Sequence, residues 1–219
     1  MSRIAVVGGH GKVALHLLSE LSGAGHTPVA LVRTDAYRPE LEARGAELRL
    51  VDIEREEADA FAVAFQGCDA VVFAAGGGAD GNIERKRTVD LEGSLKSADG
   101  AAEAGVRRFV QLSAIGVDDP LPDDTAPVWR AYVEAKRDAD AALRATDLEW
   151  TIIRPGRLTD DPATGLVALG EVARGDVTRA DVAAVIAAVL EDLRTVGRQW
   201  DLVGGDTPVS EAVERLVTG

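Results

Sequence analysis

The sequence predicts a three-layer α/β fold, with a parallel, doubly wound sheet and helices on both of its faces. Short β-branched runs alternate with longer segments of helical periodicity along the whole chain, which is typical of βαβ units. Most of the short runs are continuously apolar, as expected of strands that helices cover on both sides. The expected strands are Ile4–Val7, Val29–Val32, Glu47–Val51, Ala70–Ala74, Arg108–Leu112 and Trp150–Ile153.

The segments between the strands predict helices. Val13, Leu17 and Leu21 recur at helical spacing, and the glycines that follow end this helix. A capping box of Thr178 and Asp181 is expected to begin a later helix. The other expected helices cover residues 60–65, about 85–104, 128–145, 180–193, and a last helix that begins at Thr207-Pro208 with proline in its first turn.

Two stretches, residues 115–127 and 157–177, show the least regular pattern. Loops at the carboxyl ends of the strands build the site in a parallel sheet, so both stretches are candidate substrate-side elements. The alternative is that both are plain surface connections.

Composition limits the classes of function. The 219 residues, 46% of them apolar, suit one globular domain over 1–219. A formal net charge of −13 disfavours nucleic-acid binding. A single cysteine, Cys68, excludes an intrachain disulfide, and three histidines without metal-site spacing predict no metal. Without an apolar run long enough for a signal peptide or a membrane span, we expect a cytoplasmic monomer or homodimer that contacts no membrane.

A glycine-rich loop, Gly8-Gly9-His10-Gly11, follows the first expected strand and opens the first expected helix. Gly9, Gly11 and Ala14 form the pattern G-x-G-x-x-A, whose small residues allow a tight turn and a close approach of the backbone to a pyrophosphate. The helix N-terminus then presents free N–H groups to the anion, and Lys12 adds a positive charge. The sequence therefore predicts a dinucleotide-binding Rossmann domain; the alternative is a purely structural turn.

The end of the second strand distinguishes the two nicotinamide nucleotides. An acidic residue there would accept hydrogen bonds from the ribose of NAD, but Arg33 occupies that position, 24 residues after Gly9. A guanidinium can pair with the 2′-phosphate of NADP, and Arg38 could assist. Asp35 is an alternative contact for the ribose, and Asp52 could accept from the adenine amine. We therefore expect NADP(H) in preference to NAD(H).

Further motifs extend this pattern. They are the small-residue run Ala74-Ala75-Gly76, the segment Ala104–Ser113, the motif Tyr132-Val133-Glu134-Ala135-Lys136, the segment Trp150–Gly156 and the helix start Thr178–Ala183. Together with the glycine-rich loop they resemble the short-chain dehydrogenase/reductase superfamily, and within it the compact NAD(P)H-binding members called NmrA-like or biliverdin-IXβ/flavin-reductase-like. The resemblance covers nearly the whole chain.

The resemblance implies cofactor contacts at three groups of positions. Those of the phosphate loop are Gly8, Gly9, His10, Gly11, Lys12 and Val13. Those on the adenosine side are Arg33, Asp52 and Ile53. Those on the nicotinamide side are Ala74, Ala75, Gly76, Leu112, Ser113, Tyr132, Lys136 and Pro155.

Tyr132 and Lys136 stand four residues apart in an expected helix and so share one face. A nearby ammonium favours the phenolate, so we expect Lys136 to lower the pKa of Tyr132 and Tyr132 to exchange a proton with a carbonyl or alcohol. Ser113 could polarise the substrate oxygen, which completes the superfamily's catalytic trio. The alternative is a half-buried tyrosine beside a snorkelling lysine. The superfamily often has an asparagine in the helix before the fifth strand, where Asp90 or a neighbour stands here.

Three functions are compatible with these residues. The catalytic trio favours an oxidoreductase that transfers hydride between NADPH and an unidentified small molecule. The lack of a separate substrate domain favours a non-catalytic NADP(H)-binding redox sensor or regulator. A sugar-nucleotide epimerase or dehydratase ranks third, because such enzymes have a larger C-terminal domain than the roughly 65 residues that follow Pro155.

Overall fold

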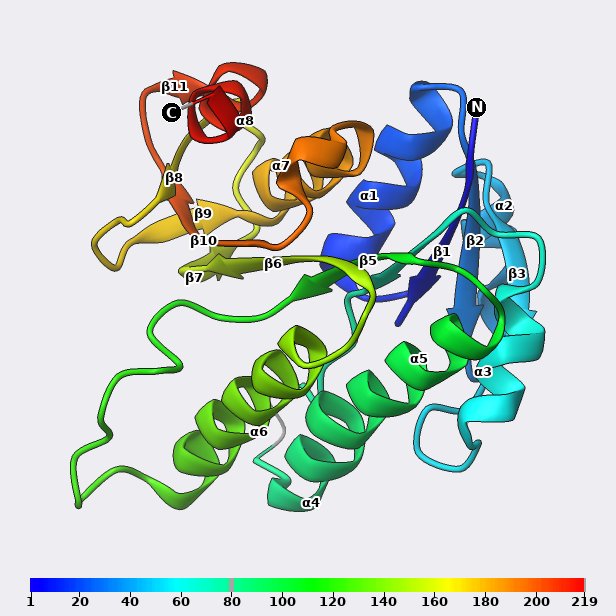
Figure 1. Ribbon diagram of the computed structural model, residues 1–219, viewed down its shortest axis with the longest axis horizontal. Coiled ribbons are helices and arrows are strands. Elements are labelled where there is room, and N and C mark those ends of the chain that lie inside the picture. The colour runs from blue at the N-terminus through cyan, green and yellow to red at the C-terminus, as the bar shows by residue number, and fades with distance from the viewer. Residues whose placement is uncertain (79–80, 219) are drawn as a thin grey trace.

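A single nine-stranded sheet runs through the centre of the computed structural model, which describes residues 1–78 and 81–218 (Figure 1). Its strands are β1 (Arg3–Val7), β2 (Thr27–Val32), β3 (Glu47–Leu50), β4 (Ala70–Phe73), β5 (Arg108–Leu112), β6 (Glu149–Pro155), β8 (Leu166–Gly170), β10 (Arg198–Gly204) and β11 (Thr207–Pro208). Their order is β11-β8-β10-β6-β5-β4-β1-β2-β3. The run β3-β2-β1-β4-β5-β6 is all parallel and has the Rossmann order. The predicted fold class is confirmed.

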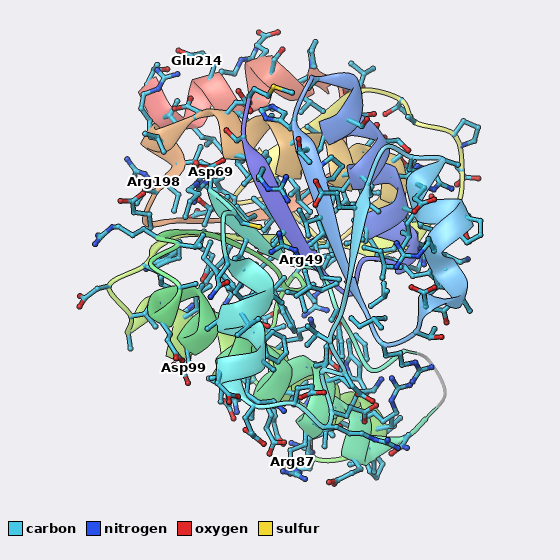
Figure 2. All side chains as sticks on the ribbon, turned by 90° about the vertical axis from the view of Figure 1, so that its right-hand side faces the viewer. Arg49, Asp69, Arg87, Asp99, Arg198 and Glu214 are labelled. Carbon is cyan, nitrogen blue, oxygen red and sulfur yellow. The ribbon has the colours of Figure 1, made fainter. Side chains whose placement is uncertain are left out.

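Helices cover both faces of the sheet. On one face lie α1 (Lys12–Gly23), α7 (Arg179–Glu191) and α8 (Val209–Thr218), and on the other α3 (Ala58–Phe65), α5 (Glu92–Glu103) and α6 (Pro127–Arg144). The shorter helices are η1 (Asp35–Tyr37), α2 (Arg38–Glu42), α4 (Ile83–Arg85), the π-helix η2 (Lys86–Leu91) and η3 (Leu193–Thr195). In Figure 2, Glu214 on α8 lies at one end of the molecule, and Arg87 and Asp99 lie toward the other.

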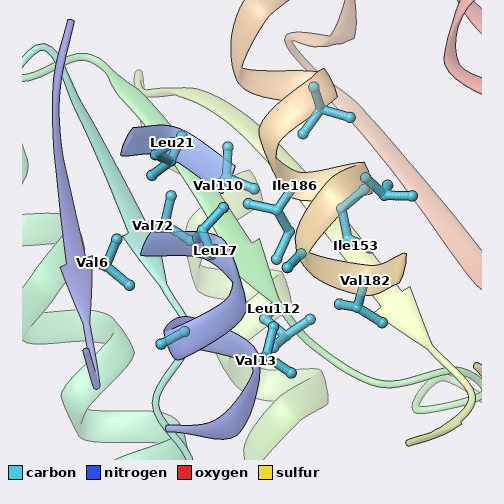
Figure 3. Packing of buried hydrophobic residues seen from close by; sticks show 14 of the residues in the cluster. Val6, Val13, Leu17, Leu21, Val72, Val110, Leu112, Ile153, Val182 and Ile186 are labelled. Carbon is cyan, nitrogen blue, oxygen red and sulfur yellow. The ribbon is translucent and has the colours of Figure 1, made fainter. Parts of the chain in front are cut away.

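The core has two halves because successive residues of each strand face opposite layers. Val6 of β1 packs with Leu17 of α1 and Ile186 of α7, and all three are fully buried (Figure 3). The neighbouring Val7 faces the other half, beside Phe61 of α3. Each such side chain contributes roughly 2 kcal/mol on burial. This packing holds the carboxyl ends of the strands in one row.

The helix expected over residues 85–104 is three consecutive segments, α4, η2 and α5. The middle segment is a π-helix, in which a wider turn changes the direction of its side chains. Asp90 of this segment points inward, where its Oδ2 accepts a hydrogen bond of 2.8 Å from the N–H of Gly77. The expected helix is therefore confirmed over nearly its whole length, and the π-helical turn that the sequence did not predict coincides with the hydrogen bond from Gly77 to Asp90.

The C-terminal quarter corrects three further expectations. The stretch 157–177 contains β7 (Arg157–Thr159), β8 and the start of β9 (Asp176–Thr178); β7 and β9 form a small parallel sheet of their own. Strand β8 runs antiparallel to β10, so the main sheet is not purely parallel. The last helix begins at Val209, since Thr207 and Pro208 pair with β8 at the sheet edge. An edge strand tolerates proline because it needs no N–H on its outer side.

The start of α7 confirms half of the expected capping box. Thr178 Oγ1 accepts from the N–H of Asp181 at 3.0 Å. The Asp181 carboxylate, however, accepts from the N–H groups of Thr164 and Gly165 and not from the backbone N–H of Thr178, which a full capping box requires. It thereby ties the loop before β8 to α7. Within residues 1–78 and 81–218, none of the helices combines the length and the apolar character that crossing a bilayer requires.

Candidate functional site

The candidate site lies at the carboxyl ends of β1 and β4, where the direction of the chain's connections along the sheet reverses. Gly8 ends β1 with φ of +78°, and a Cβ there would lie 2.7 Å from Cα of Ala75. A Cβ on Gly9 would lie 2.7 Å from Cβ of Ala30 on β2. No side chain caps the first turn of α1, so its N–H groups stay available to an anion. The backbone here forms a cradle that only small residues permit.

A first cavity of about 230 Å³ opens beside this cradle. Its lining combines the glycine-rich loop, the ends of β2 to β4 and the start of the helical segment after β4; it comprises Gly8, His10, Gly11, Leu31, Val32, Arg33, Tyr37, Val51, Asp52, Ile53, Glu54, Ala74, Ala75, Gly76, Arg85 and Val89. Most residues that the sequence assigned to the phosphate loop and the adenosine side meet here. The predicted contacts themselves stay a prediction.

Arg33 is exposed at this cavity, and no hydrogen bond or ion pair joins its guanidinium to another described residue. Arg38 differs, because its guanidinium lies 2.5 Å from Asp35 and 3.4 Å from Glu42, and it does not line the cavity. The expected assistance from Arg38 is therefore not supported in this arrangement. Asp35, the alternative ribose contact, is the carboxylate partner of Arg38 in this ion pair.

Other residues of the loop region have partners of their own. The ring of His10 stacks on Tyr37, with centroids 3.6 Å apart, and its Nε2 lies 2.8 Å from Glu40. Lys12 reaches across to Asp160, at 2.5 Å. Val13 is buried in the core, so only its backbone can face a ligand. Tyr37 was not singled out in the sequence, and its place in a short helix after β2 gave no signal of the stacking.

A second cavity of about 900 Å³ lies on the other side of Gly76, toward α6 and the small β7–β9 sheet. Its described lining consists of Gly78, Gly81, Lys86, Ala114, Ile115, Val128, Trp129, Tyr132, Pro155, Gly156, Arg157, Leu158, Arg174, Gly175, Asp176 and Arg179. Both of the irregular stretches expected to form substrate-side elements contribute to it. Of the predicted catalytic trio, only Tyr132 lines this cavity.

Lys136 is buried and faces the backbone of the strand ends instead. Its Nζ lies 3.2 Å from Oδ1 of Asp90 and donates to the carbonyls of Leu112 and Ala75, at 3.2 and 3.4 Å. Asp90 Oδ1 has no aligned hydrogen bond among the described residues, so this contact is mainly an ion pair. Burial by itself lowers the pKa of Lys136, but Asp90, together with Tyr132 and Asp140, outweighs burial and raises the pKa above its ordinary value. The lysine is therefore a permanent charge that joins β4, β5 and η2.

Ser113 is also buried and donates its hydroxyl proton to Oδ2 of Asp140, at 2.8 Å. The same carboxylate accepts from Gln111 Nε2 at 2.6 Å and from Arg154 Nε at 2.8 Å. Arg154 in turn pairs with Asp118 of the substrate-side loop at 2.7 Å. Because its proton is already donated inward, Ser113 does not offer it to a ligand in the second cavity in this arrangement. The network links β5, β6 and α6 to that loop.

Tyr132 lies half-buried at the second cavity, and its hydroxyl makes no hydrogen bond to a described residue. Its ring lies 5.2 Å from that of Trp129 and 5.9 Å from the ammonium of Lys86. Burial raises the pKa of Tyr132, and the opposing effect of Lys136 does not offset it, partly because Asp90 adds in the same direction. The expectation of a lowered pKa was therefore wrong, because burial of the phenol outweighs the effect of Lys136 and the nearby carboxylates of Asp90 and Asp140 add to it.

The sequence did not single out Asp140 or Lys86 as site residues. It indicated Asp90 only as one of several neighbouring residues. A signal existed for Asp140, because Tyr132, Lys136 and Asp140 follow each other at four-residue spacing on one helix face. Lys86, the first residue of the π-helix η2, carried no such signal in the residue pattern.

Comparisons with known proteins agree with this geometry. The model of a family described as NAD(P)H-binding matches residues 8–193. The chain belongs to the NAD(P)H-binding family. The Bacillus subtilis "Uncharacterized sugar epimerase YhfK" is 36% identical over 216 residues, which cover 98% of this chain and 100% of that protein. As a family member the chain is oxidoreductase-like, with a compact fold of the short-chain dehydrogenase/reductase kind.

Similar solved structures extend the likeness to three dimensions. A Bacillus halodurans protein, provisionally named an NAD-dependent epimerase/dehydratase, superposes with a TM-score of 0.91 at 39% identity, covering 98% of this chain and 100% of that one. The oxidoreductase ylbE from Lactococcus lactis superposes with a TM-score of 0.87 at 28% identity, covering 99% and 97%. Both superpositions span nearly the whole of this chain.

Proposed function

We propose that this protein is an NADPH-dependent oxidoreductase that reduces a small molecule bound in the second cavity. The exposed guanidinium of Arg33 carries the cofactor part of the proposal, because it lacks a partner among the described residues and faces the first cavity. The 2′-phosphate of NADPH would supply the negative counter-charge for this guanidinium, and arginine is suited to pair with phosphate. The cradle at Gly8 and Gly9 fits a pyrophosphate, since any side chain there would fill it.

The residues of the site divide the remaining tasks. When bound, NADPH would supply the hydride for an electron-poor carbon of the substrate. Tyr132 is protonated at neutral pH, as an ordinary tyrosine is, and burial raises its pKa further. Its hydroxyl, which bonds none of the described residues, lines the second cavity and would donate that proton to the substrate oxygen. Solvent then returns a proton to Tyr132. Lys136 keeps the carbonyls of Ala75 and Leu112 in place between the two cavities.

Calorimetric titration with NADPH and NADH tests the cofactor preference. We expect Arg33→Ala to weaken NADPH binding by about tenfold or more and to leave NADH binding within about threefold, because only NADPH has the 2′-phosphate. Arg198→Ala is the matched control, as Arg198 is an exposed arginine at the amino end of β10. Wild-type protein that binds NADH more tightly than NADPH would contradict the preference.

Turnover is tested with NADPH and a panel of flavins, quinones and carbonyl compounds, followed by nicotinamide absorbance. With a substrate in hand, Tyr132→Phe should lower kcat by about a hundredfold if the phenol donates the proton. Unchanged turnover of the variant would remove that role from Tyr132.

A second candidate, a non-catalytic NADP(H)-dependent sensor, is favoured by one observation. Two of the three groups of the predicted trio, Ser113 and Lys136, are engaged with buried carboxylates and do not line the second cavity. NADPH binding without turnover of any panel compound, together with a partner affinity that differs between NADP⁺ and NADPH, would favour this candidate. Sugar nucleotides belong in the same panel because the Bacillus subtilis relative is named a sugar epimerase.

A further inference from the structure

The π-helix η2 places a lysine at the second cavity. Lys86 is 5% exposed and lines the cavity beside Tyr132. Its ammonium donates to the carbonyl of Gly78 and lies 5.9 Å from the centroid of the Tyr132 ring. No carboxylate lies within ion-pair distance of it among the residues that the structure describes. Short π-helical segments occur frequently at functional sites, and this one supplies Lys86 in addition to Asp90.

The charge of Lys86 is incompletely satisfied. An ammonium has three donors, and one carbonyl and one aromatic face leave part of that capacity unused. A buried charge without a counter-ion is costly, and an anion that arrives with a ligand offsets this cost with a charge-assisted hydrogen bond. The position therefore resembles a subsite that a ligand completes.

The rest of the second cavity has matching chemistry. Among its described lining residues, four are basic and one, Asp176, is acidic, in a chain whose net charge is −13. The three arginines have carboxylate partners: Arg157 with Asp176, Arg174 with Asp119, and Arg179 with Asp160. Among the described lining residues, Lys86 is thus the basic side chain that has no carboxylate partner. The same lining also contains apolar and aromatic side chains, those of Ile115, Val128, Trp129 and Leu158.

We propose that Lys86 is an anion subsite of the second cavity and that the substrate is an apolar molecule with a carboxylate or phosphate group. The anionic group binds the ammonium of Lys86, and the apolar body packs against Trp129 and its neighbours. The inference rests on the proposed function only in taking this cavity as the substrate site.

Calorimetry with three probes of one shape tests the subsite: 1-naphthoate, 1-naphthyl phosphate and the neutral 1-naphthamide, each in the presence of saturating NADP⁺. We expect at least one anionic probe to bind about tenfold or more tightly than the amide, as the loss of one charge-assisted hydrogen bond implies. The preference between the two anions tells which anionic group the subsite takes.

Variants locate the effect. Lys86→Met keeps the length of the side chain, and we expect it to abolish the preference for the anions while amide binding stays within about threefold. Lys86→Arg should restore the preference in part, because it restores the charge. Lys96→Met is the matched control, as Lys96 lies on the exposed side of α5 and bonds the carbonyl of Glu56. Thermal unfolding of each variant shows that it is folded.

The possible outcomes separate the two proposals. Equal binding of the three probes, or an anion preference that survives in Lys86→Met, overturns the subsite whatever the protein catalyses. An anion preference that disappears in Lys86→Met supports it even where NADPH oxidation is never seen, in which case the oxidoreductase proposal fails alone. Should NADP⁺ fail to bind, the same titrations without nucleotide decide the role of Lys86.

Discussion

The ammonium of Lys136 lies 3.2 Å from Oδ1 of Asp90, and the two side chains are 6% and 1% exposed. The pair joins α6 to the π-helix η2. Because Lys136 also donates to the carbonyls of Ala75 and Leu112, the pair connects three strand-end segments around one charge. A buried pair of this kind specifies an arrangement more than it adds stability, because desolvation offsets much of the attraction.

Asp90→Asn should destabilise the protein by about 3 kcal/mol at pH 7, because it leaves the buried charge of Lys136 without its carboxylate counter-charge. In the wild type the raised pKa of Lys136 means that its contribution is complete at neutral pH and is lost only as the pH rises through that raised value. In the variant, burial lowers the pKa of Lys136, so the unfolded state binds the proton more readily. The stability deficit should then shrink between pH 7 and pH 9.5.

Urea unfolding of both proteins at the two pH values measures this difference. Asp99→Asn on the exposed side of α5 is the control and should change stability by less than about 0.5 kcal/mol. A deficit that stays constant with pH would mean that the charge of Lys136 is not the cause.

Gly8→Ala should cost more stability than Gly25→Ala, although both glycines have a positive φ, +78° and +85°. The left-handed conformation alone costs an alanine about 1 kcal/mol, and that is all that Gly25 should lose, since nothing lies within 4 Å of a Cβ there. At Gly8 the new Cβ would also lie 2.7 Å from Ala75, so β1 and the loop after β4 must separate.

We expect nucleotide affinity to fall in Gly8→Ala and to be unchanged in Gly25→Ala, as calorimetry with NADPH can show. A similar loss of stability in the two variants would indicate that backbone strain, and not the close approach to Ala75, determines the free-energy cost of Gly8→Ala.

Tyr132 should ionise above the ordinary range of tyrosine, because burial opposes the phenolate more strongly than Lys136 favours it. Absorbance at 295 nm in a Tyr37→Phe background isolates this phenol, as Tyr37 and Tyr132 are the two tyrosines of the chain. The same protein in concentrated guanidinium gives the reference value. A folded-state midpoint at or below that reference would restore the alternative of a phenolate acting as a base.

Asp181→Asn should destabilise the protein by about 2 kcal/mol at pH 7, because the carboxylate holds the N–H groups of Thr164 and Gly165 against α7. Burial opposes ionisation of Asp181, but these hydrogen bonds outweigh it and lower its pKa. Its contribution is therefore present above the ordinary aspartate value and lost as the pH falls through the lowered one.

The difference between wild type and Asp181→Asn should accordingly vanish in strong acid, as denaturant unfolding at pH 7 and near pH 2.5 would show. Asp206→Asn, an exposed aspartate after β10, serves as the control and should match the wild type at both pH values. If the difference in unfolding free energy persists in acid, the shape of the side chain and not its charge is the cause.

The sequence by itself determined the layers of the fold and the place of the phosphate loop. Continuous apolar runs such as that of β4 require cover on both faces, and the spacing of Gly8, Gly9 and Gly11 reflects a backbone constraint that few residues satisfy. Such signals are local, since they depend on one strand or one turn. They located the elements that meet in the first cavity before any contact was known.

Only the tertiary structure decided which polar side chains face the cavities. Ser113 and Lys136 point to Asp140 and Asp90, residues that other turns and helices bring to them, so their proton or charge is already engaged. Lys86 lies at the second cavity, at the start of the π-helix η2. Pairing and pKa depend on neighbours that are distant in the chain, and for that reason residue type and spacing do not determine them.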